Sequence, residues 1–352
     1  MFVNRLKIHN FRNIIEQEYF FKQNINIFYG KNGAGKTSIL EAINFLSSGK
    51  SFRKGNYKSL INFNADTLTV YLEYSDGEIS SSLAVNKHQS GQWQANKNSN
   101  KIKKQSEIIS SLPVVAIDPE VYRLVDFGPL YRRNFLDWLV FHVEHSYLDL
   151  WKKVYKCVKQ LNVLYKSKSS GKQIDLWEKS FILFSDELNE IRKVFFNRIK
   201  PHILKLSIYM QEEITDLSII YKQGWSHELS LTEQLRLDRD KNVHYGQLQH
   251  GPQKMDIKIT TGKLPAAQTL SRGQKKVLSI TFYMAYITLL LENTPIKPIL
   301  CLDDFDAEID NEKLLKAAKF FEESKTQIFI TTVHKEKIEK VFTEAQMFHV
   351  EH

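Results

Sequence analysis

The alternation of short apolar segments with helical patterns predicts a mixed α/β core in the first and last thirds of the chain. Residues 25–29 are predicted as a short strand, after which apolar residues recur at helical spacing through residue 46. Further pattern-based elements are a helix over 311–323 and buried strands over 113–117, 296–302 and 328–332. Strands separated by helices favour a parallel sheet, so the predicted fold class is α/β.

A second pattern, the alternation of apolar and polar residues, occupies residues 68–95. Such alternation predicts half-buried strands, and Asp76-Gly77 is a hairpin-turn signal. Residues 86–105 are rich in Asn, Lys, Gln and Ser, which predicts a loop or a frayed hairpin tip.

Between residues 128 and 212 the pattern changes to long helices. No Gly or Pro occurs over residues 131–169, and apolar residues there form a stripe at helical spacing. Residues 166–172 predict a turn, and a second helix is expected from Leu176 onwards, with Pro201 as a break or kink. At about 1.5 Å per residue each helix is about 40–50 Å long, which predicts a short antiparallel arm.

These patterns predict two domains: a discontinuous α/β head, residues 1–127 and 213–352, and an inserted helical arm, residues 128–212. The 352 residues include 49 Lys and Arg against 40 Asp and Glu, a net charge of +9. Residues 1–127 carry +5, the arm carries +6 and residues 213–352 carry −2. This balance favours polyanionic partners such as nucleic acid, although any one basic patch is more typical of a solvated surface.

Cysteine content and apolar runs bear on localisation. The two cysteines, Cys157 and Cys301, are too few for a disulfide framework. The first seven residues are charged too early for the apolar core of a signal peptide, and the longest apolar run, residues 280–291, is too short to cross a bilayer. We expect no membrane partner and a reducing compartment, most simply the bacterial cytoplasm.

Residues 30–37 match the phosphate-loop pattern GxxxxGK[ST] at every fixed position. Glycines let backbone N–H groups face phosphates without a Cβ in the way, and the following helix N-terminus adds its dipole. Lys36 is expected to reach the β- and γ-phosphates of ATP, and Thr37 to ligate Mg²⁺. A glycine turn without nucleotide is the alternative. The predicted ATP-binding residues of this loop are Gly30, Lys31, Asn32, Gly33, Ala34, Gly35, Lys36, Thr37 and Ser38.

Two adjacent carboxylates follow the predicted strand that ends at Leu302. Ligands bind at the carboxyl ends of strands in an open α/β sheet, so both carboxylates are candidates for the same site. Asp303 is expected to hold Mg²⁺, and Asp304 to orient or deprotonate the attacking water as a catalytic residue with Lys36. Adjacent acids after a strand are also common as plain surface residues. The interpretation as a metal and catalytic pair therefore depends on the presence of the phosphate loop.

Residues 270–276 (Leu-Ser-Arg-Gly-Gln-Lys-Lys) open another predicted helix. Ser271, Gly273 and Gln274 can cap that helix, which is the simpler interpretation. They can also grip a γ-phosphate.

The order of these motifs resembles the ABC-type ATPase heads of the SMC and Rad50 group. That resemblance implies a dimer in which Ser271, Gly273 and Gln274 contact ATP bound by the other subunit. It also implies an interface segment ending at Asp310 and a switch histidine, His334, although a lone His after a strand is more often structural. An inserted arm this short, with Cys157 as its only cysteine, lacks the metal-binding hook of Rad50 and the long arms of SMC proteins.

Further motifs narrow the resemblance to the RecF family over essentially the whole chain. The most specific are Asn-Phe-Arg-Asn at 10–13 and Arg-Arg-Asn-Phe-Leu-Asp at 132–137. Arg12 and Asn13 are thereby expected at the ATP site. Two features depart from the pattern: Gln253-Lys254 replaces a His-Arg pair, and residues 113–127 lack the glutamine that usually senses the γ-phosphate.

The resemblance implies an ATP-dependent recombination mediator with weak, DNA-stimulated ATPase activity. Its dimer would bind double-stranded, gapped or junction DNA and help RecO and RecR load RecA onto single strands. These steps serve gap repair, replication restart and the SOS response. Candidate DNA contacts are Arg53, Lys54, Arg132 and Arg133, against ordinary surface or structural roles.

Other classes remain as alternatives. A motor or transport ATPase would turn over rapidly without DNA, and a structural DNA-binding protein would not need an intact Lys36 and acid pair. A nuclease would need a second acidic cluster.

Overall fold

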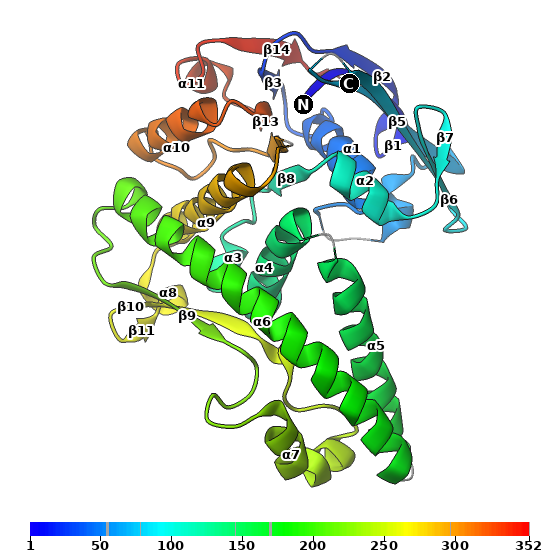
Figure 1. Cartoon of the computed structure of the whole chain (residues 1–352). Coiled ribbons are helices and arrows are strands. Elements are labelled where there is room, and N and C mark those ends of the chain that lie inside the picture. The colour runs from blue at the N-terminus through cyan, green and yellow to red at the C-terminus, as the bar shows by residue number, and fades with distance from the viewer. Residues whose placement is uncertain (54–55, 78, 145, 169–170, 296, 352) are drawn as a thin grey trace. The chain divides into compact units, whose positions relative to one another are not determined.

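The computed structural model describes residues 1–53, 56–77, 79–144, 146–168, 171–295 and 297–351 (Figure 1). Contacts divide the chain into unit 1, Met1–Val121 with Leu291–His352, and unit 2, Tyr122–Leu290. This division differs from the predicted domains because the strands of residues 217–261 pair with one another and pack on a helix of the arm. Within the described residues, no helix combines the length and apolar character needed to cross a membrane.

Unit 1 contains a six-stranded antiparallel sheet in the order β2-β1-β4-β5-β6-β7. The hairpin predicted around Asp76-Gly77 is confirmed by the pairing of the third and fourth of these strands. The sheet comprises β1 (Phe2–Phe11), β2 (Ile14–Phe20), β4 (Thr67–Asp76), β5 (Ile79–His88), β6 (Trp93–Lys97) and β7 (Asn100–Ile102).

Of the two alternatives for residues 86–105, a loop or a hairpin tip, the structure shows the hairpin. These residues form the end of β5, the β6–β7 hairpin and the start of α2 (Gln105–Ser111). Asn98 and Ser99 connect the hairpin with φ of 49° and 64°, the positive values that two-residue hairpin turns favour. Ala95 and Ile102 are buried, so the strands need few apolar residues and the polar majority lies on the exposed side.

A five-stranded parallel sheet in the order β14-β3-β13-β12-β8 completes unit 1. The predicted strands are confirmed as β3 (Ile25–Tyr29), β8 (Val114–Ile117), β12 (Ile299–Leu302) and β13 (Gln327–Thr332). β12 is shorter than predicted, with residue 296 outside the described residues, and the fifth strand, β14 (Ala345–His349), was not predicted. The helices of this unit are α1 (Lys36–Ser48), α2, α10 (Asn311–Glu323) and α11 (Lys335–Glu339), with a 3₁₀ turn at Tyr57–Leu60. Because β3, β13 and β12 are neighbours, their carboxyl ends bring three candidate segments together.

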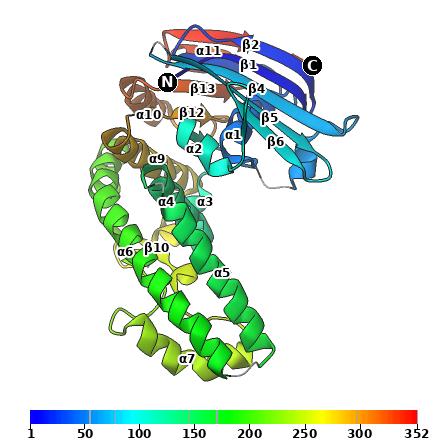
Figure 2. The ribbon, with the colours of Figure 1, turned by 45° about the vertical axis from the view of Figure 1, so that its right-hand side comes forward.

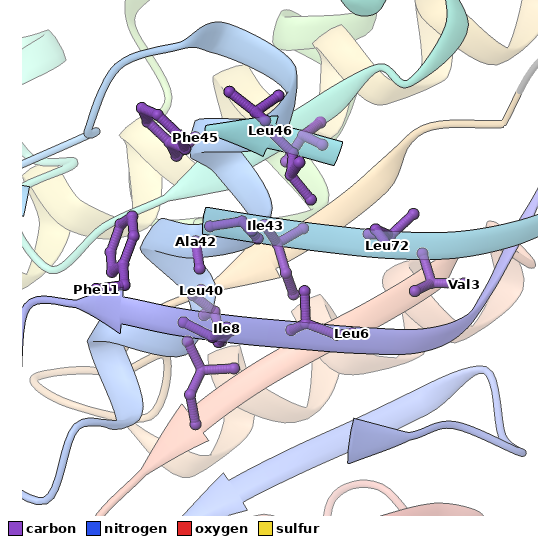
Figure 3. Packing of buried hydrophobic residues seen from close by; sticks show 14 of the residues in the cluster. Val3, Leu6, Ile8, Phe11, Leu40, Ala42, Ile43, Phe45, Leu46 and Leu72 are labelled. Atoms are coloured by element: carbon purple, nitrogen blue, oxygen red, sulfur yellow. The ribbon is translucent and has the colours of Figure 1, made fainter. Parts of the chain in front are cut away.

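The core of unit 1 lies between the antiparallel sheet and α1 (Figure 3). Leu6 and Ile8 are alternate residues of β1 and Phe11 is its last residue, and all three belong to the buried cluster that contains Ile43 and Phe45 of α1. The rings of Phe11 and Phe45 meet edge to face at 5.9 Å. Burial of these side chains fixes the first turn of α1, and with it the phosphate loop, against the sheet.

Unit 2 is built on two long helices, α5 (Tyr147–Lys166) and α6 (Gly171–Met210), which lie side by side and run antiparallel (Figures 1 and 2). The predicted helical arm is confirmed in kind but differs in detail. The first predicted helix consists of two helices, because α4 (Pro129–Val143) ends before α5 begins. The second, α6, continues through Pro201 instead of ending there. The remaining elements are α3 (Arg123–Asp126), β9 (Leu217–Lys222), α7 (Leu231–Tyr245), a 3₁₀ turn at Pro252–Lys254, β10 (Asp256–Thr261), β11 (Leu264–Pro265), α8 (Ala266–Thr269) and α9 (Arg272–Asn293).

The interior of unit 2 contains a buried ion pair. Arg192, with no exposed side-chain surface, makes a two-pronged contact with Asp137 at 2.8 and 2.9 Å. It also donates to the Pro252 carbonyl at 2.7 Å. Asp137 accepts further bonds from the Tyr147 hydroxyl and the Trp151 ring nitrogen. The pair therefore ties α4, α5 and α6 to the 3₁₀ turn at Pro252–Lys254.

Candidate nucleotide site

The phosphate loop follows β3 and ends where α1 begins. Gly30, Gly33 and Gly35 have φ of 149°, 84° and 105°, values that side chains rarely adopt. A Cβ on Gly30 would also lie 2.4 Å from the Val350 carbonyl oxygen. Gly35 caps α1 without a side-chain bond, so the backbone N–H groups of the first turn are available to an anion.

The ammonium of Lys36 is held over this loop. Its Nζ donates to the carbonyl oxygens of Gly30 and Lys31, at 2.9 Å each. Burial lowers the pKa of Lys36, while the nearby carboxylates of Asp304 and Asp303 act to raise it. The loop backbone thus holds a buried cation in the loop before any phosphate arrives.

Asp303 is buried at the end of β12 and accepts two hydroxyl hydrogen bonds. Thr37 donates to its Oδ1 at 2.9 Å and Thr331 donates to the same atom at 2.6 Å. Burial raises the pKa of Asp303 to about 6. Thr37 and Asp303 thus lie in contact, and the hydroxyl and carboxylate oxygens are the donors that Mg²⁺ prefers, so these residues fit that ion.

Asp304 has φ of 43°, and its backbone N–H donates to the Thr331 hydroxyl at 2.8 Å. Thr331 therefore orients both carboxylate residues at once. The sequence provided no indication of this role for Thr331, since Thr is a common residue in strands.

A cavity of about 850 Å³ opens onto the phosphate loop and Asp304. Arg12 and Asn13, both expected here, line it. Asn13 accepts from the Ser38 hydroxyl at 2.9 Å and donates to the Gly33 carbonyl at 3.3 Å. The sequence interpretation missed several lining residues that come from outside any motif: Lys58, Ser59, Ile61, Asn62, Phe63 and Gln89.

Arg12 is held by a buried carboxylate that the motif analysis assigned no role. Glu41 of α1 is fully buried and contacts Arg12 at 2.8 and 3.2 Å. Ser51 also donates to Glu41, and the Arg53 guanidinium lies 3.9 Å from it. The Glu41 carboxylate thus lies close to both Arg12 and Arg53, two cations that line the cavity.

Ser271 and Gln274 lie at the start of α9 in unit 2 and form a capping box. The Gln274 side chain accepts from the Ser271 backbone at 2.9 Å, and the Ser271 hydroxyl accepts from the Gln274 backbone at 3.2 Å. The capping interpretation is therefore confirmed, and Gly273 lies in the same first turn. Contact with a nucleotide stays a prediction.

His334 lines a second cavity of about 640 Å³ in unit 1, whereas Asp310 is not among its lining residues. Asp310 caps α10 by accepting from the Lys313 backbone at 2.9 Å. The backbone N–H of His334 donates to the Thr332 hydroxyl at 2.8 Å.

The structure separates the four candidate DNA contacts. Arg53 is exposed beside the first cavity, whereas Lys54 lies outside the described residues. Arg132 is buried, pairs with Asp256 at 2.7 Å and donates to two carbonyls, so little of it is available to DNA. Arg133 is half-buried and donates to the Met255 carbonyl at 2.7 Å.

The parallel sheet, the phosphate loop and the adjoining carboxylates define an ABC-type P-loop ATPase fold. A family model described as "RecF/RecN/SMC N terminal domain" matches residues 2–352. The chain belongs to the RecF family. It is 33% identical over 354 residues to the DNA replication and repair protein RecF of Shewanella piezotolerans, covering 100% of this chain and 98% of the relative. It is 32% identical to that of Coxiella burnetii (strain RSA 493), covering 100% and 98%.

Solved structures carry the same fold. A structure of the recombination mediator protein RecF with ATP superposes with a TM-score of 0.87 at 24% identity, covering 99% of this chain and 95% of the other. A crystal structure of an Smc head superposes with a TM-score of 0.55 at 16% identity, covering 95% and 90%. The first of these superposes more closely than the second, and both show the same fold.

Proposed function

We propose that this chain is an ATP-dependent DNA-binding recombination mediator that works as an ATP-induced dimer. The observation that carries the proposal is the cavity lined by the phosphate loop, the buried Lys36 and Asp304, with Asp303 bonded to Thr37 of the same loop. The printed titles of the similar structures name RecF with ATP and the RecFOR pathway, which supports the same role.

In the proposed site, the N–H groups of the first α1 turn and Lys36 bind the phosphates of ATP. Thr37 and Asp303 would hold Mg²⁺, which supplies charge neutralisation on the phosphates when bound. Asp304, held by Thr331, orients or deprotonates the attacking water. The proposed hydrolysis is slow and acts as a release step.

Dimerisation would place Ser271, Gly273 and Gln274 of one copy against the nucleotide of the other. The capping box supports this proposal because it fixes the Ser271 and Gln274 side chains at an exposed helix N-terminus. Asp310 and His334 belong to the proposed interface and switch.

DNA is the proposed polyanionic partner, in double-stranded, gapped or junction form. The excess of basic residues, +5 in residues 1–127 and +6 in residues 128–212, supports it, with Arg53 and Lys54 as candidate contacts and Arg133 as a secondary one. RecR with RecO, and indirectly RecA, are the proposed protein partners in the cytoplasm, where weak DNA-stimulated hydrolysis would release the protein.

The first test is binding to a gapped duplex with and without ATP, beside intact duplex and single-stranded controls. We expect ATP-dependent binding that favours duplex-containing DNA, together with a protein dimer seen by sedimentation. Binding that does not depend on ATP would contradict the proposed ATP-dependent dimer.

Ser271→Arg provides the matched variant, since it changes the proposed trans contact without touching the phosphate loop. We expect ATP affinity within about twofold of the original chain and loss of the ATP-dependent dimer, because a bulky cation replaces a small hydroxyl. Normal dimers in this variant would contradict the trans site.

A further inference from the structure

Two consecutive threonines end β13, and each hydroxyl bonds a different carboxylate that follows β12. Thr331 donates to Asp303 at 2.6 Å, and Thr332 donates to Asp306 Oδ1 at 2.8 Å. Both also accept a backbone N–H: Thr331 from Asp304, and Thr332 from His334, each at 2.8 Å. Successive residues of a strand point to opposite faces, so the pair serves two sides of the sheet.

The Thr332 bond lies in an environment where losing it is costly. Thr332 is fully buried and Asp306 is 2% exposed. In the part of the chain that the structure describes, Asp306 Oδ2 has no hydrogen-bond partner. A buried carboxylate with one satisfied oxygen depends strongly on that single bond.

A second link joins the same two segments. Lys337 of α11 donates from Nζ to the carbonyl oxygens of Asp306 and Ile309, at 3.0 and 3.3 Å. Residues 306–309 are therefore fastened to residues 332–337 at two points, one through a side-chain carboxylate and one through the backbone. Residues from both segments line the second cavity.

We propose that Thr332 is a positioning residue, which couples the position of the His334 backbone to the position of residues 306–310. The proposal rests on the proposed function, in which Asp310 and its neighbours meet a second copy of this chain. Contact with that copy displaces the 306–310 segment, and the bond from Asp306 through Thr332 to the His334 backbone carries the displacement. Because Thr331 is the adjacent residue, the same strand end also holds Asp303 and Asp304.

The test compares Thr332→Val, which keeps the shape and removes the hydroxyl, with Thr332→Ser, which keeps the hydroxyl. In Thr332→Val we expect ATP affinity within about twofold, because Lys36, Thr37 and Asp303 keep their contacts. We expect the rate of hydrolysis per dimer to fall about tenfold, the size of one lost hydrogen bond to a charged group. Thr332→Ser should recover most of that rate.

Hydrogen–deuterium exchange gives a readout independent of hydrolysis. In Thr332→Val without nucleotide, peptides spanning 304–312 and 331–338 should exchange about tenfold faster, since the His334 N–H loses its acceptor. Thr69→Val is the matched control: its hydroxyl accepts from Asn86 at 2.9 Å in the antiparallel sheet of the same unit. That control should leave both peptides unchanged.

Should Thr332→Val fail to fold, Lys337→Met removes the other link from a partly exposed position and should speed exchange at 304–312. Unchanged exchange and unchanged hydrolysis in Thr332→Val, or equal defects in the Val and Ser variants, would overturn the positioning role. Failure of the original chain to dimerise with ATP would instead overturn the proposed function, so the two failures are distinguishable.

Discussion

Ionised side chains are used in opposite ways in the two units. In unit 1, Lys36 is held by backbone carbonyls and Arg12 by Glu41, and both line or adjoin an open cavity. In unit 2, Arg192 and Arg132 are buried against Asp137 and Asp256. Unit 1 has a net charge of zero and unit 2 carries the whole net charge of +9. The cations that line the cavity therefore lie in the unit without excess charge, and it is their pairing that distinguishes them from the cations that hold helices together.

The largest effect is expected when the buried ion pair of unit 2 is broken. Asp137→Ala leaves Arg192 buried without a counter-charge, and we expect the free energy of unfolding to fall by about 3–5 kcal/mol. Urea unfolding followed by tryptophan fluorescence reports this, because Trp138, Trp151, Trp177 and Trp225 all belong to unit 2.

Asp149→Ala is the control, because its pair with Lys152 at 3.4 Å is largely exposed. It should change the free energy of unfolding by no more than about 0.5 kcal/mol. Equal losses in the two variants would remove the distinction between buried and exposed pairs.

A smaller effect is expected at the cation of unit 1. Lys36→Ala should weaken ATP binding by about 1.5–3 kcal/mol, or about tenfold to 150-fold, and should abolish the ATP-dependent dimer. The unfolding of unit 2 should be unchanged. Isothermal titration with ATP measures the loss, and ordinary affinity in this variant would refute the role of Lys36.

The smallest effect is expected at Asp303, the carboxylate proposed to bind Mg²⁺. Asp303→Asn should raise the free energy of unfolding of the nucleotide-free protein by about 1–2 kcal/mol at pH 8, because it removes a charge that burial disfavours. The raised pKa of Asp303 means that its protonated form stabilises the fold below about pH 6, and that this stability is lost as pH rises through that value.

The gain from Asp303→Asn should therefore vanish at pH 4, where the original carboxyl is protonated as well. Thermal unfolding at the two pH values checks the sign. A variant less stable than the original chain at pH 8 would show that Asp303 contributes to the fold rather than opposing it.

The local motifs were predictable because their chemistry lies within a few consecutive residues. The loop from Gly30 to Thr37 forms as expected, since positive φ at its glycines and the start of α1 depend on nearest neighbours. Over residues 86–105 the polar composition left a loop and a hairpin tip as equal alternatives, and the pairing of β6 with β7 about Asn98 selects the hairpin. Edge strands need only one apolar face.

What the sequence determined by itself was the class: the phosphate loop, the acids after a strand, the helical arm and the family. The tertiary structure decided which of several similar side chains line the cavity and which are buried in pairs. It buried Arg132, paired Arg12 with Glu41, and placed Thr331 and Thr332 on two different carboxylates. The physical reason is that burial and pairing depend on residues distant in sequence, which meet only when the strands and helices pack.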